Sequence, residues 1–134
     1  MMAWTHAAIG AAIGPLAPDD ASAFTVGAIS HGAADLIPHR DFGMNVELPL
    51  LAVIMVYIAW RYGVRSKQFW GAVGGFSPDI ENGLVLLGVL PRAIYPTHTK
   101  KAWYIGHGRK VRSIVPQIIL IAICLCVAEL DKPD

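Results

Sequence analysis

The chain has 134 residues, a hydrophobic fraction of 54% and a mean hydropathy of +0.48. Its length allows a single domain over residues 1–134 and excludes a separate binding module, and its apolar content exceeds that of an ordinary soluble domain. The net charge is only +1, and the first 39 residues contain no Lys or Arg. We therefore expect a helical membrane domain with membrane lipid as a partner, and no nucleic-acid partner.

Apolar segments separated by prolines, glycines and charges predict an all-α bundle of about five short helices, at residues 3–16, 21–37, 48–60, 68–90 and 113–128. Asp20 or Ser22 is expected to cap the second helix, and Pro38 to end it near Leu36. Pro78 is expected to break the fourth helix in its middle. None of these runs reaches the ~20 residues of a comfortable span, which favours short or tilted helices.

If consecutive helices alternate in direction, one side of the bundle collects the start of the first helix, the ends of the second and fourth, and the start of the fifth. Four histidines then converge there, namely His6, His39, His98 and His107. The same side receives most of the basic residues, namely Arg40, Arg92, Lys100, Lys101, Arg109, Lys110 and Arg112. By the positive-inside rule this side is cytoplasmic, in a multi-pass protein of a bacterial-type inner membrane.

The segment at residues 30–41 carries two histidines and two aspartates in an otherwise apolar chain. His31 and Asp35 are four residues apart, so a helix presents both on one face. His39 continues this spacing, and Pro38 turns the chain so that His39 and Asp41 can fold back. We expect His31, Asp35 and His39 to bind a common divalent metal, with zinc as the best fit. The alternative is a set of helix caps and solvated side chains.

Asp79 and Glu81 lie inside an apolar segment, where an unpaired carboxylate costs several kcal/mol. Asp79 is expected to reach the metal from the fourth helix, unless it only caps the helical turn after Pro78. Glu81 is the weaker candidate, since it can serve as a partner of the helix dipole. His98 and His107 sit in a basic loop that offers imidazole ligands and cations for phosphate, or simply sets the topology.

Two motifs carry a family resemblance, Gly-x-x-Ser-His-x-x-x-Asp at residues 27–35 and Pro-His-x-Asp at residues 38–41. Weaker matches are Thr5-His6, Ser77-Pro78-Asp79 and His98. With them the chain resembles small membrane-bound metal-dependent hydrolases related to zinc-dependent phospholipase C. The resemblance implies an all-helical fold and a cluster of divalent metals, zinc in particular, held by His6, His31, Asp35, His39, Asp79 and His98. The His-x-x-x-Glu pair of the phospholipases is absent, which lowers the expected number of metals.

These observations lead to the expectation of a membrane-embedded hydrolase that acts on a phosphoester, including that of a phospholipid. Metal-activated water would attack, with Asp35 or Asp41 as ligand or general base. Cations of the basic loop, namely Lys100, Lys101 and Arg109, would neutralise the phosphate. Two alternatives stay open: a non-catalytic membrane protein with a structural or ion-carrying metal site, and a purely structural protein whose polar groups are helix caps.

Overall fold

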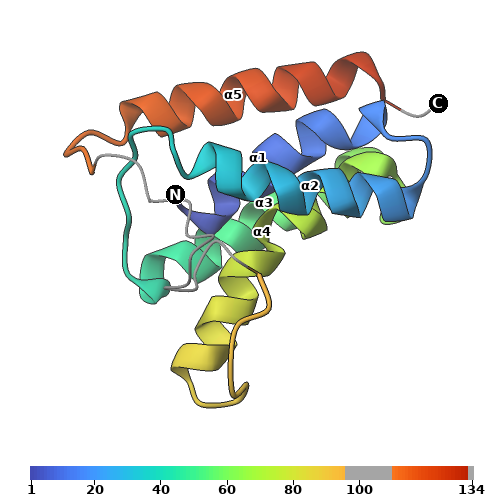
Figure 1. Cartoon of the computed structure of the whole chain (residues 1–134). Coiled ribbons are helices and arrows are strands. Elements are labelled where there is room, and N and C mark those ends of the chain that lie inside the picture. The colour runs from blue at the N-terminus through green and yellow to red at the C-terminus, as the bar shows by residue number, and fades with distance from the viewer. Residues whose placement is uncertain (96–109, 133–134) are drawn as a thin grey trace.

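A computed structural model describes residues 1–95 and 110–132, and within these ranges the chain is all-α, as the sequence predicts (Figure 1). It forms five α-helices and one short 3-10 helix: α1 (Ala3–Ile13), η1 (Gly14–Leu16), α2 (Asp20–Ala34), α3 (Met44–Tyr62), α4 (Lys67–Leu86) and α5 (Val115–Leu130). Within the described ranges, β pairing is limited to an isolated bridge between His39 and Lys110. The five predicted helices therefore exist, with their ends shifted by a few residues.

The predicted cap of α2 is wrong by one residue. Asp19, with φ −145° and ψ 174°, precedes the helix in extended backbone, and its carboxylate accepts the N–H of Ser22 at 2.8 Å. Asp20 is already the first helical residue, so its side chain lies too far along the helix to fill this role. At the other end, α2 stops at Ala34, and Asp35 follows as its C-cap.

The predicted break of α4 at Pro78 is also wrong, because the helix runs without interruption through this residue. Proline has no N–H, so the carbonyl of Gly74 loses its usual helical donor. The hydroxyl of Ser77 replaces that donor and bonds the Gly74 carbonyl oxygen at 2.8 Å. Asp79 therefore lies inside a continuous helix, which excludes its interpretation as an N-terminal cap.

The centre of the bundle is a direct backbone contact of α4 with α1 and α2. A Cβ atom on Gly71 would overlap the carbonyl group of Gly10 in α1, and a Cβ on Gly27 in α2 would overlap the carbonyl oxygen of Gly71. A Cβ on Gly75 would overlap the carbonyl oxygen of His6. Only glycine permits such an approach, so these positions set the distances between the three helices.

The contacts of α1 along α4 show that the two helices run in opposite directions, as the alternating topology predicts. Gly14 packs against the Lys67 backbone at one end of the pair, and His6 against Gly75 at the other. This order places the beginning of α1 beside the second half of α4. In Figure 1 the C-terminal part of α4, in yellow, extends beyond the other helices.

Polar contacts fasten α5 to the rest of the bundle at both of its ends. Near its start, Gln117 is buried, and its Oε1 accepts the N–H of Arg40 at 2.9 Å. Near its end, the Glu129 carboxylate accepts two bonds from the guanidinium of Arg61 and a bond at 2.9 Å from the hydroxyl of Tyr62. The helix therefore runs from the end of the bundle that holds Arg40 to the end of α3.

One helix among the described residues, α3, is long and apolar enough to cross a membrane. It has 19 residues, and large apolar side chains on its outer surface remain exposed, namely Val53, Val56 and Trp60. The 16-residue α5 is also apolar, and it exposes Ile119 and Ile123. Large exposed apolar surfaces of this kind indicate contact with a partner or with lipid.

Gly71→Ala should destabilise the fold, since the added Cβ has no room between the α1 and α4 backbones. Overpacking usually costs about 1–3 kcal/mol, and a backbone obstacle places this variant at or above the upper value. The matched control is Gly83→Ala in the same helix, where a Cβ meets no atom within 4 Å. Thermal unfolding should show a lowered Tm for the first variant alone; equal Tm values would contradict the close contact.

Candidate metal centre

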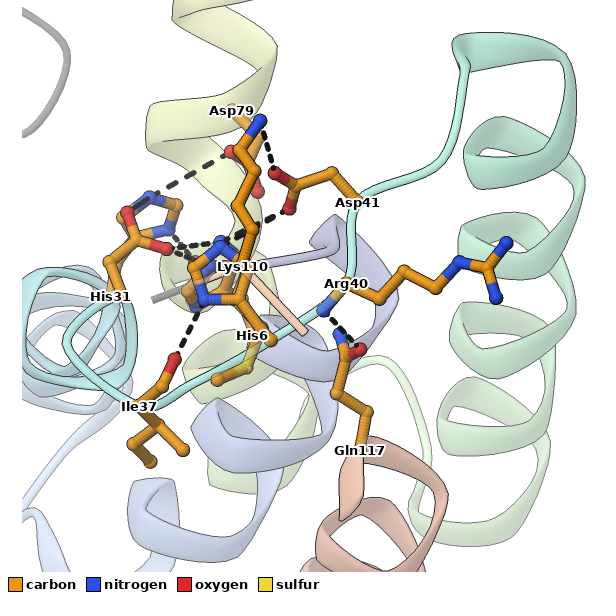
Figure 2. A network of polar contacts seen from close by, with 12 residues as sticks. His6, His31, Ile37, Arg40, Asp41, Asp79, Lys110 and Gln117 are labelled. Atoms are coloured by element: carbon orange, nitrogen blue, oxygen red, sulfur yellow. Dashed lines mark hydrogen bonds and ion pairs between the residues drawn. The ribbon is translucent and has the colours of Figure 1, made fainter. Parts of the chain in front are cut away.

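Three side chains from three helices meet where the beginning of α1, the end of α2 and the middle of α4 come together (Figure 2). They are His6, His31 and Asp79, and one potential ligand atom from each lies within 4.8 Å of the others. The two histidines are buried, whereas 21% of the Asp79 side chain is exposed. This group of two imidazoles and one carboxylate has the nitrogen and oxygen ligands that zinc accepts.

The orientation of His31 is fixed by the backbone of α4. Its Nδ1–H donates to the carbonyl oxygen of Gly75 at 2.9 Å, so in the neutral ring Nε2 carries a lone pair. Nε2 lies 3.4 Å from Asp35 Oδ2 and 3.7 Å from Asp79 Oδ1. A lone pair that faces two carboxylate oxygens is repelled unless a proton or a metal ion lies between them. Ligands of a tetrahedral zinc are about 3.4 Å apart, close to these distances.

His6 stacks on His31 with a distance of 3.8 Å between the ring centroids. Burial lowers the pKa of His6 to about 4, although the hydrogen bond with Asp35 acts in the opposite direction. The ring is therefore neutral at pH 7, and its Nε2–H donates to Asp35 Oδ1 at 3.1 Å. Nδ1 is left as a buried acceptor with no hydrogen-bond partner among residues 1–95 and 110–132. A buried lone pair of this kind suits a metal ion.

Asp35 lies at the C-terminal end of α2 and is buried among positively polarised groups. Burial opposes its ionisation, but hydrogen bonds with His31 and His6 lower the pKa of its carboxyl group well below the usual range. The same carboxylate raises the pKa of His31 against the effect of burial. The ammonium group of Met1 also contacts Asp35. Asp35 is thus an ionised, buried carboxylate that attracts cations.

His39 and Asp41 form a second pair beside this group. The Nδ1–H of His39 donates to the carbonyl oxygen of Ile37 at 2.7 Å, and its Nε2 lies 3.2 Å from Asp41 Oδ1. Asp41 Oδ2 lies 3.5 Å from the ammonium of Lys110 (Figure 2). The structure therefore places His39 against Asp41, and it groups His6 and Asp79 with His31. A common ion for His31, Asp35 and His39 stays a prediction.

The remaining predicted residues divide into two groups. Glu81 lies outside the centre, because its carboxylate oxygens accept the N–H groups of Ile94 and Tyr95, each at 2.8 Å, and hold the chain that follows α4. The second group is the candidates of the basic loop, which are not among the residues that the structure describes. They are His98, His107, Lys100, Lys101 and Arg109. Their relation to the centre stays a prediction.

Two supporting groups escaped the sequence analysis. The Gly75 carbonyl orients His31, and no side chain signals such a backbone role. Gln117 holds the backbone between His39 and Asp41, since its Oε1 accepts the N–H of Arg40 at 2.9 Å. The sequence does contain a signal for Gln117, since its side-chain amide lies in the apolar run of residues 113–128. Burying an amide without a hydrogen-bond partner is costly, so a partner could have been predicted.

Comparisons of the chain with family models, with curated proteins and with solved structures find no match. The resemblance to membrane-bound hydrolases therefore stays an expectation from the motifs at residues 27–35 and 38–41. What defines the centre is its own chemistry: two buried imidazoles from α1 and α2, each with one nitrogen fixed by a hydrogen bond, and carboxylates from two further positions.

His31→Ala and Asp79→Asn should each lower the zinc content of the purified protein to about a tenth or less at equal free zinc, since even outer-shell changes cost 10–100-fold in affinity. Asp20→Asn is the matched control, because Asp20 is an exposed carboxylate at the far end of α2. Elemental analysis by mass spectrometry gives the metal content of each variant. Wild-type content in Asp79→Asn would remove Asp79 from the ligand set.

Proposed function

We propose that the chain is a membrane-embedded metal-dependent hydrolase of phosphoesters, with zinc as the metal. The observation that carries this proposal is the three-residue group of His6, His31 and Asp79. Catalytic zinc sites use three protein ligands and keep a further position open, and the partial exposure of Asp79 gives the centre access from outside. A bound zinc ion supplies a water ligand of lowered pKa and polarises a phosphoryl oxygen.

Beside the centre, the chain offers a cavity of about 510 Å³ that can hold the substrate. It is lined by Arg40, Asp41, Lys110, Val111 and Arg112. Three cationic side chains there favour an anionic group such as phosphate. Asp41 is one-third exposed and lies between His39 and Lys110, where it can accept a proton during hydrolysis. A phosphoester combines the negative charge and the hydrolysable bond that this arrangement suits.

The second candidate is a structural or ion-carrying metal site built from the same residues. It is favoured by the position of Asp35, whose Oδ2 lies 3.4 Å from His31 Nε2 and is close enough to complete a four-ligand set. A closed set leaves no position for water or substrate, which is typical of structural zinc. The two candidates therefore differ in whether an exchangeable position exists.

His6→Ala should reduce both bound zinc and the hydrolysis of a generic phosphodiester such as bis(p-nitrophenyl) phosphate. Asp41→Asn should lower turnover by about 10²–10⁴-fold while the zinc content stays unchanged, since it removes a proton acceptor rather than a ligand. Chelated wild-type protein is the control. Equal hydrolysis after chelation would remove the mechanism, and full zinc occupancy without turnover would favour the structural site.

We also propose that the protein is a multi-pass protein of a bacterial-type inner membrane in which α3 crosses the bilayer and the metal centre lies at the cytoplasmic end. In support, α3 has the required length and its outer surface is apolar. The basic residues near the start of α5, Lys110 and Arg112, lie at the same end as Arg40, because the Nη1–H of Arg40 donates to the carbonyl oxygen of Arg112 at 2.8 Å. From the sequence, Arg92, Lys100, Lys101 and Arg109 are expected at this end as well. Fewer basic residues belong to the opposite end, namely Arg61, Arg65, Lys67 and Lys132.

Cysteine labelling in intact cells tests this orientation. In a Cys124→Ser, Cys126→Ser background, Val64→Cys after α3 should react with an impermeant maleimide added outside, whereas Ser113→Cys before α5 should not. Both positions are exposed in the structure, so they form a matched pair. Labelling of Ser113→Cys alone would reverse the topology, and recovery of the protein in the soluble fraction without detergent would contradict the membrane assignment.

A further inference from the structure

An apolar groove of about 330 Å³ leads away from the metal centre between the first half of α3 and the second half of α4. Asp79 belongs to its lining, and the Oδ1 of this residue lies 3.7 Å from His31 Nε2. The groove and the centre therefore share Asp79 and lie next to each other. Beyond Asp79 and Glu47 the walls are mainly apolar, formed by Met44, Leu48, Leu51, Leu84, Leu86 and Leu87.

The shape and surroundings of the groove favour a hydrocarbon chain as its occupant. Its volume is near the lower limit of ligand pockets, about 300 Å³, which suits one chain rather than two. Leu48 is 49% exposed and Leu86 76% exposed, so the groove is open along its length. One of its walls belongs to α3, the helix suited to a bilayer, so a chain can enter from lipid without crossing water.

We infer that this groove holds the single hydrocarbon chain of an amphiphilic phosphoester whose phosphate lies at the metal centre. The inference rests on the proposed function, because Asp79 at the polar end of the groove repels an anionic head group unless a cation is bound between its carboxylate and the histidines. For an ester taken up from water, each buried CH₂ group strengthens binding by about fourfold, so a chain of several carbons adds orders of magnitude in affinity over the bare phosphoester.

Photolabelling locates the chain independently of turnover. The probe is dodecyl phosphate with a diazirine at the end of its chain, added to zinc-loaded protein in lipid nanodiscs. We expect the label in peptides that contain residues 44–51 or 84–87, the two walls of the groove. Label spread evenly over the outer surfaces of α3 and α5 would show that the probe is only dissolved in the surrounding lipid, and it would overturn the inference. Cross-linked pairs of protein chains would assign the groove to a second copy and overturn it too.

A pair of tryptophan variants on α3 supplies the matched control. Leu48→Trp fills the groove, whereas Val56→Trp adds the same side chain at an exposed position of α3 that does not line it. We expect Leu48→Trp to reduce groove labelling at least about tenfold, with wild-type zinc content, and Val56→Trp to change neither. Equal labelling in the two variants would overturn the inference.

Hydrolysis separates this inference from the proposed function. The KM for dodecyl p-nitrophenyl phosphate should be at least about tenfold below that for the methyl ester, and Leu48→Trp should remove the difference. Equal KM values for the two esters, with an active enzyme, would overturn the inference that the groove binds the chain and would leave the proposed hydrolase function unaffected. Groove labelling without hydrolysis of either ester would support chain binding and overturn the proposed hydrolase.

Discussion

The structure depends on one packing constraint, the direct contact of the α4 backbone with the backbones of α1 and α2. The glycines of α4, Gly71 and Gly75, leave no room for a Cβ against Gly10, Gly27 and the carbonyl of His6. This close approach also builds the site, because the carbonyl oxygen of Gly75 accepts the Nδ1–H of His31. A wider helix separation would lengthen that hydrogen bond and part the two stacked imidazoles. Stability and site geometry therefore have the same origin.

Electrostatics at the centre follow from where each imidazole is anchored. Backbone carbonyls bind one nitrogen of His31 and of His39, and Asp35 binds one nitrogen of His6. In each case the hydrogen bond selects the tautomer and turns the other nitrogen in a fixed direction. Burial keeps His6 neutral while Asp35 remains ionised. The result is a preformed arrangement of lone pairs and negative charge, which costs little reorganisation when a cation binds.

The two ends of the bundle differ in the polar contacts that they contain. At one end, the ion pair of Arg61 with Glu129 joins α3 to α5. At the other end, Gln117 and Lys110 support the segment that carries His39 and Asp41, while Asp79 belongs both to the candidate metal centre and to the lining of the apolar groove. The polar centre and the apolar groove thus share Asp79, which lies on α4 beside the candidate membrane span α3.

The sequence by itself determined the all-α class, the five helices and the residue types of the centre, because apolar runs and isolated polar groups are local signals. It did not determine that α4 continues through Pro78, which depends on the Ser77 hydroxyl as a substitute donor. Nor did it show that the imidazole of His6 stacks on that of His31. This stacking was decided by tertiary structure alone, since the contact between α1 and α4 at their glycines brings together residues far apart in the chain.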